Sequence, residues 1–334
     1  LKKQILAAII LTLVVISGAQ TAAQDFDPSS MRTPDGQPHI SGIFTFRTLT
    51  PLQRPEALAE KSALDAEEAA QFEASERNRL NRDLFDPEQG ARSAGYQPRA
   101  EGGVLSYNEF WYERGVELVA DKRTSLIVDP PSGRLPAMTE SGRRNNAAAR
   151  AYRNEHRYDS YENRSLFDRC VMGFNSGPPM TSGAYNNNVH ILQTPGYVTI
   201  VNEMVHNARI IPLDGRAHGE LIQLSGDSRG HWEGNTLVVE TTNFLRETSF
   251  RNGVTTSDLK LVEKFTRTDA GTLMYDVTVE DPNTWSRPWS YRIPMRANDM
   301  PIFEYACHEG NYGLENILAG AREKEAAMDA AAGR

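Results

Sequence analysis

The chain of 334 residues has only two cysteines, no excess of positive charge and, beyond its N-terminus, no long hydrophobic run. Its 36 basic residues are outnumbered by 44 acidic ones, so the net charge of −8 indicates no basic surface for nucleic acid. Motifs for nucleotides, calcium and haem attachment are also missing: there is no Walker A loop, strand-linked dinucleotide glycine motif, EF-hand loop or haem-binding cysteine pair. We therefore expect no cofactor and no nucleic-acid partner.

The composition is that of a globular protein able to bury a sizeable core. Hydrophobic residues make up 39% of the chain and charged residues 24%. These shares exclude a chain that is disordered throughout. The length fits one large or two modest domains, because β-rich domains often exceed roughly 200 residues.

The first 23 residues are typical of a secretory signal peptide. Two lysines precede an apolar segment from Ile5 to Ile16, and Thr21-Ala22-Ala23 places small residues before a cleavage site at Gln24. The apolar segment is about a dozen residues long, too short to span a bilayer of ~30 Å. An uncleaved N-terminal anchor is the alternative. We expect an exported protein, periplasmic or extracellular, with no membrane span in the mature chain.

Both cysteines, Cys170 and Cys307, belong to the mature chain. In an oxidising compartment two thiols favour a disulfide, and two unpaired buried thiols are the alternative. A catalytic cysteine is less favoured, because only the neighbouring His308 offers Cys307 a base.

The β-rich part of the chain spans residues 184–310. Turn sequences such as Asp214-Gly215 and Gly234-Asn235 separate short β-branched segments, which is typical of an antiparallel sheet and not of βαβ units. We predict a mainly β fold with peripheral helices, an antiparallel lipocalin-like barrel or open half-barrel. Strands are expected at Val189–Gln193, Tyr197–Val205, Ala208–Leu213, Leu221–Leu224, Leu237–Thr242, Leu259–Arg267, Leu273–Glu280 and Tyr291–Met295.

Residues 24–183 are expected to wrap this sheet, and residues 311–334 to form a C-terminal helix and tail. Asp65 and Glu68 have the spacing of a capping box and predict the start of a helix. The expected elements of the N-terminal region are an extended run at Ile40–Leu49, helices at Leu64–Leu84, Arg143–His156 and Tyr161–Cys170, and a loose hairpin at Leu126–Met138.

The segment Gly226-Asp227-Ser228-Arg229-Gly230 matches the G-x-S-x-G pattern of a nucleophile elbow. That motif requires a following helix, whereas residues 231–240 have the pattern of a β-hairpin with a Gly-Asn turn. We therefore predict that Ser228 is a loop residue between strands. The alternative is a serine nucleophile on another fold, with His218 or His231 as its base.

Candidate acid–base groups gather between residues 203 and 218. On a regular strand Glu203 and His206 point to opposite faces, so one of them is expected inside the sheet, where its pKa would shift. The candidate catalytic residues are Glu203, His206, Asp214, Arg216, His218 and Ser228, with Arg209 as a ligand-binding residue. An exposed hairpin end with salt bridges is the alternative. The histidines have no metal-ligand spacing, so no metal site is expected.

A second group of candidate ligand-binding residues combines aromatic rings with cations. It consists of Trp285, Arg287, Trp289, Tyr305 and His308. Aromatic rings and one arginine can line a pocket for a planar or sugar-like ligand. Core packing at the open end of a barrel explains the same rings.

Several motifs recur in the order of a known family. They include Gln193-Thr194-Pro195-Gly196-Tyr197, Asp214-Gly215-Arg216, the segment Trp232-Glu233-Gly234-Asn235-Thr236-Leu237-Val238-Val239-Glu240-Thr241-Thr242, and Glu304-Tyr305-Ala306-Cys307. With them the mature chain resembles, over nearly its whole length, a large family of exported bacterial proteins of unknown function. The resemblance implies no activity and no catalytic roles. Asn235 stands where such proteins more commonly have Asp.

Three functions remain open on the sequence. The first is an exported small-molecule-binding barrel protein with its ligand in the sheet concavity. The second is a secreted hydrolase or lyase that uses the His/Glu/Asp/Arg site, and the third is an envelope-associated structural protein. The side chains that line the largest cavity would distinguish them.

Overall fold

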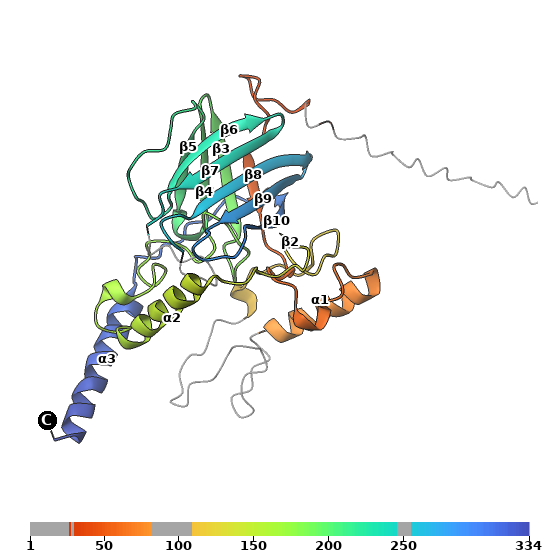
Figure 1. Cartoon of the computed structure of the whole chain (residues 1–334). Helices are drawn as coiled ribbons and strands as arrows, with labels where there is room; N and C mark the ends of the chain where they lie inside the picture. Colours follow the sequence, from red (N-terminus) through yellow and green to blue (C-terminus); the bar gives the residue numbers. More distant parts are fainter. Residues whose placement is uncertain (1–26, 28–29, 82–108, 246–254, 334) are drawn as a thin grey trace, which may run out of the picture.

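The computed structural model describes residue 27 and residues 30–81, 109–245 and 255–333. Within these ranges the protein is mainly β, as predicted, and the expected signal segment 1–23 lies outside them. Nine strands form an antiparallel sheet that curls into a nearly closed barrel, and three α-helices lie around its lower end in Figure 1. No helix among the described residues is both long and apolar enough to cross a membrane.

The strand order around the barrel is β5-β4-β3-β1-β10-β9-β8-β7-β6, and a further short strand, β2, pairs with β10. Every pairing is antiparallel. The strands are β1 (Gly42–Thr45), β2 (Ile127–Asp129), β3 (Asn188–Thr194), β4 (Tyr197–Asn202), β5 (Ala208–Pro212), β6 (Asp227–Glu233), β7 (Thr236–Thr242), β8 (Lys260–Asp269), β9 (Thr272–Glu280) and β10 (Trp289–Ala297). The N-terminal region therefore supplies strands to the sheet and does more than surround it.

Four local expectations are wrong. Leu221–Leu224 forms no strand, because only an isolated bridge joins Gln223 to Phe244. The hairpin at Leu126–Met138 is absent, because its first arm pairs with β10 and Met138 bridges Trp285 instead. The strand expected to reach Val205 ends at Asn202, where the chain turns. Ser228 lies within β6 and not in a loop.

The barrel interior is a packed apolar core. Alternate residues of β9 point inward, so Leu273, Tyr275, Val277 and Val279 are all fully buried. The seam between β5 and β6 is closed by side chains. A Cβ at Gly230 would lie 2.6 Å from a Leu213 methyl group, so only glycine lets the two edge strands approach this closely.

The helices are α1 (Ala66–Leu80), α2 (Glu140–Glu155) and α3 (Tyr312–Ala331). The predicted capping box is present: the Asp65 carboxylate accepts from the Glu68 amide at 2.9 Å, and Glu68 accepts from the Asp65 amide at 3.3 Å. The helix expected at Tyr161–Cys170 is reduced to a 3₁₀ turn at Tyr161–Asn163. Further 3₁₀ turns lie at Glu56–Leu58, Glu109–Trp111 and Met204–His206.

The predicted disulfide is present. Cys170 and Cys307 are joined across a separation of 137 residues, with their Cα atoms 5.6 Å apart. The bond ties the segment before β3 to the segment that leads from β10 into α3. It therefore connects the chain before β3 with the chain after β10, and strands β3 to β10 lie between the two cysteines in the sequence.

We expect this bond to contribute substantially to stability. A free-thiol titration of the denatured, unreduced protein should find close to no thiols. The paired Cys170→Ser and Cys307→Ser substitutions should lower the unfolding free energy by about 4 kcal/mol, because a closed loop of this length restricts the unfolded chain. Two titratable thiols per chain, or an unchanged urea midpoint in the double variant, would contradict the prediction.

Candidate functional site

An ion pair is enclosed in the barrel. Arg209 on β5 donates two hydrogen bonds to Glu263 on β8, at 2.6 and 2.8 Å. The side chains are 3% and 0% exposed, so both charges are out of contact with solvent. This parallel, two-bond arrangement is the strongest geometry for an arginine–carboxylate pair. Sequence analysis placed Arg209 in a ligand site, whereas the structure places it in the core.

Hydroxyl groups extend this pair into a network. The Tyr275 hydroxyl donates to Glu263 Oε1 at 2.6 Å, and the Ser228 and Thr241 hydroxyls are 2.9 Å apart. Arg209 Nη1 reaches Ser228 Oγ at 3.5 Å, which joins β5 to β6 across the seam. The partners of Ser228 are thus a threonine and an arginine, and neither is a general base for a nucleophilic serine.

The protonation of the network follows from its enclosure. Burial by itself would lower the pKa of Arg209, but the adjacent Glu263 carboxylate raises that pKa above its ordinary value. Burial, reinforced by the Glu263 charge, raises the pKa of Tyr275 well above 10. Arg209 is therefore a cation and Tyr275 a neutral donor at physiological pH, so the network is a fixed structural element.

Sequence reasoning did not assign Glu263 a role in a site, although a signal was there. Glu263 shares its parity with Leu261 and Phe265, and both of these are fully buried. On a strand, residues two apart point to the same face. A carboxylate between two inward apolar residues predicts a buried charge that needs a partner.

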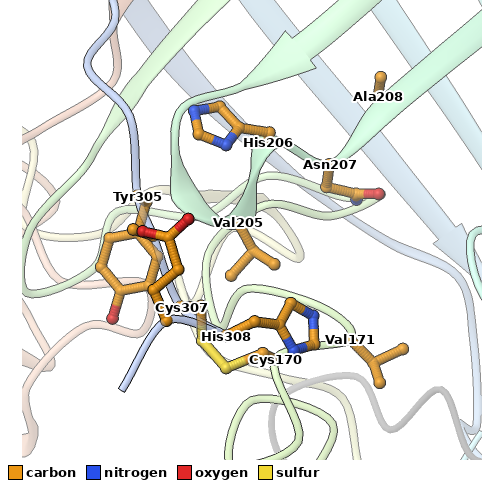
Figure 2. Close-up of a pocket in the computed structure, with 11 residues that line it drawn as sticks. Cys170, Val171, Val205, His206, Asn207, Ala208, Tyr305, Cys307 and His308 are labelled. Carbon is orange, nitrogen blue, oxygen red and sulfur yellow. A yellow bond between two sulfur atoms is a disulfide. The ribbon is translucent and has the colours of Figure 1, made fainter. Parts of the chain in front are cut away.

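A cavity lies outside the barrel, beside the disulfide. Its volume is about 390 Å³. It brings together residues from three parts of the chain, and Figure 2 shows His206 and His308 on either side of Val205. The lining residues are Cys170, Val171, Val205, His206, Asn207, Ala208, Tyr305, Ala306, Cys307, His308 and Glu309, which we call the disulfide pocket.

The turn between β4 and β5 contacts the segment after β10, and that segment forms one wall of the pocket. Glu203, which is 2% exposed, accepts a hydrogen bond from the Phe303 amide at 3.0 Å. The His206 ring lies 3.3 Å from the Phe303 carbonyl oxygen. The expectation that Glu203 or His206 points into the barrel from a strand is wrong. Both belong to this turn, and both contact the backbone of Phe303 in the segment after β10.

The same turn has an unusual backbone. Val205 and His206 have φ values of 60° and 49°, and Cys170 across the pocket has a φ of 56°. Left-handed conformations are costly for residues with a Cβ, above all for β-branched valine. Such residues gather at functional sites, where the surrounding structure holds them in place. Three of them line this one pocket.

The other residues of the expected 203–218 site do not converge. Asp214 and Arg216 form an exposed pair in the loop after β5, where the Arg216 hydrogen bond lowers the pKa of Asp214 to about 2. His218 Nδ1 lies 3.4 Å from Asp227 Oδ2 in the same loop region. This part of the segment is therefore exposed and carries a salt bridge, as the alternative expected, but it is a loop between the unpaired edge strands β5 and β6 and not the end of a hairpin.

The residues of the expected aromatic site also lie in separate places. Trp285 and Trp289 pack edge to face in the core, with ring centres 6.1 Å apart. Arg287 is exposed and donates to both Asp129 oxygens at 2.8 Å. Only Tyr305 and His308 of this group reach the disulfide pocket, where they meet His206.

The described residues include no cluster of three histidine, cysteine or carboxylate side chains placed to hold a metal ion. The pocket instead offers hydrogen-bonding groups of both kinds. Imidazole nitrogens and the Asn207 amide donate or accept, and the Glu309 carboxylate accepts.

Breaking the enclosed ion pair should be strongly destabilising. Glu263→Gln should lower the unfolding free energy by about 3–5 kcal/mol, because the buried guanidinium loses its counter-charge. The double variant Arg209→Met with Glu263→Leu should recover most of that loss. Lys264→Met, on the exposed face of the same strand, is the control and should leave the urea midpoint nearly unchanged. A Glu263→Gln protein as stable as this control would refute the assignment.

No family model, no curated protein and no solved structure matches this chain. The chemistry of its own side chains therefore has to indicate what the protein does.

Proposed function

We propose that this is an exported small-molecule-binding protein and that its ligand occupies the disulfide pocket. The observation that carries the proposal is the composition of that pocket, in which polar side chains from separate parts of the chain surround one cavity of about 390 Å³. This volume lies in the lower part of the range for ligand sites, which suits a metabolite-sized molecule. We therefore place the ligand site in the disulfide pocket at the end of the barrel, and not in the sheet concavity where the sequence analysis expected it.

The filled barrel supports an external site. Met180, Trp289 and Tyr291 are fully buried inside it, and the Tyr291 hydroxyl donates to the Met180 carbonyl. A lipocalin-type ligand would have to displace these side chains. The disulfide pocket needs no such rearrangement.

The pocket lining indicates a neutral, polar ligand. Glu309 carries the full negative charge of the lining, while Asn207 and the two histidines provide hydrogen-bond donors and acceptors. A strongly anionic ligand would meet the Glu309 carboxylate. A small hydroxyl- or amide-bearing molecule can satisfy donors and acceptors together.

Export is supported by the disulfide and by the signal-like N-terminus. The disulfide closes one wall of the pocket, so an oxidising compartment would also complete the site. Membership of the family of exported proteins that the motifs resemble is part of the same proposal.

The alternative of a hydrolase or lyase has less support from the geometry. Ser228 is enclosed in the barrel without a base, and Asp214, Arg216 and His218 lie in an exposed loop. The histidines of the pocket have no nucleophile between them in the lining. Binding therefore explains the pocket more economically than chemistry does.

A thermal-shift screen against neutral sugars, polyols, amides and amino acids tests the proposal. A compound that binds the pocket should raise the melting temperature by several degrees, since about 2.7 kcal/mol is gained at 100 times Kd. His308→Ala should abolish the shift. His231→Ala, an exposed histidine on β6, is the matched control and should keep it. A screen without hits, or shifts that persist in His308→Ala, would overturn the proposal.

A further inference from the structure

Helix α2 is a positively charged element in an acidic protein. Between its terminal residues Glu140 and Glu155 it contains arginines but no acidic residue, whereas the whole chain has a net charge of −8. The four side chains are all exposed: Arg143, Arg144, Arg150 and Arg153. Gly142 at the N-terminus is its one buried residue, and Figure 1 shows the helix extending away from the barrel.

Part of this charge is not neutralised. Arg144 is paired with Glu140, and Arg143 donates to the Met138 carbonyl at 2.7 Å. Within the described part of the chain, Arg150 and Arg153 have neither a hydrogen-bond acceptor nor an ion-pair partner. Arg157 follows just beyond the helix and is also exposed, with its guanidinium 5.6 Å from the Tyr158 ring.

The positions of these arginines define a surface. Arg143 and Arg150 are two helical turns apart on the same side, and Arg153 lies one turn further. At 1.5 Å per residue, the first two are about 10 Å apart along the axis. A convex row with this spacing contacts several anions side by side, because its guanidinium groups do not converge on one.

Exposed tyrosines follow the arginines. Tyr158 and Tyr161, just beyond the helix, are 41% and 55% exposed, whereas Tyr152 lies on the opposite side of α2 from Arg143 and Arg150. Tyrosine has an apolar body and a polar tip, a combination suited to the boundary between lipid and water. Residues 140–169 contain no lysine, and arginine is the cation whose planar fork matches phosphate.

We propose that Arg143, Arg150, Arg153 and Arg157 bind the phosphates of an anionic lipid surface, with Tyr158 and Tyr161 at the headgroup level. The protein then associates with a membrane from one side through α2. This surface is separate from the disulfide pocket, so neither proposal depends on the other.

Vesicle binding tests the proposal. The full-length protein is sedimented with vesicles of equal parts phosphatidylglycerol and phosphatidylcholine, and with vesicles of phosphatidylcholine alone. We expect binding to the first and not to the second, and weaker binding at high salt because the contacts are exposed. Each arginine near an anionic surface strengthens binding about fivefold. The pair Arg150→Gln with Arg153→Gln should therefore weaken binding about 25-fold.

A matched variant isolates the helix from net charge. Lys260→Gln with Arg296→Gln removes two exposed cations from the barrel wall and should bind as the unchanged protein does. All variants keep the same N-terminus, and equal melting temperatures show that they fold. Equal binding by the two double variants, or no binding to anionic vesicles, would overturn the proposal. Binding of millimolar inorganic phosphate by a protein that does not bind vesicles would indicate a phosphate site, and it would also overturn the proposal.

Discussion

One enclosed ion pair links strands from both edges of the barrel sheet. The strand order leaves β5 and β6 as the two ends of an open sheet, and such edges expose unpaired backbone groups. Arg209 extends from β5 to Glu263 on β8 and touches Ser228 on β6. Side chains therefore connect β5 and β6, which are not paired through their backbones. A buried ion pair contributes little net stability, but it restricts the alternatives, because either charge left alone would be very costly.

The effect of this pair extends beyond the seam. Tyr275, which donates to Glu263, also accepts a hydrogen bond from the Met180 amide at 3.1 Å, and Tyr291 donates to the Met180 carbonyl at 2.6 Å. The segment before β3 is thereby attached to the barrel core. Cys170 lies ten residues upstream of Met180 on the same segment, so the wall of the disulfide pocket is positioned from the same network.

Local patterns in the sequence predicted much of the fold. The β-branched segments, the capping box at Asp65 and the cysteine pair depend on neighbouring residues or on elimination, and the structure contains them with the exception of the strand expected at Leu221–Leu224. The site was harder to predict because it depends on which strands meet. His206, Tyr305 and His308 were each named as candidates, but in separate groups about 100 residues apart in the chain.

Two kinds of information were absent from the sequence pattern. Alternation shows which residues of a strand point inward, but it does not show that Arg209 faces Glu263, since that contact requires the curvature of the sheet. Alternation also assumes that a strand continues. Val205 and His206 adopt left-handed conformations, which are rare for a β-branched residue such as Val205, and this turn brings Glu203 to the segment after β10.

The place of β1 in the sheet has a consequence for how the chain folds. This strand, near the N-terminus, pairs with β3 on one side and with β10, the last strand, on the other. The sheet is therefore incomplete until almost the whole chain is available, and the two pairings of β1 span long sequence separations. Topologies of this kind fold slowly, because the chain loses the entropy of closing a long loop before the stabilising contacts form. A chain that lacks β10 can form hairpins of consecutive strands, but it cannot join them into one sheet through β1.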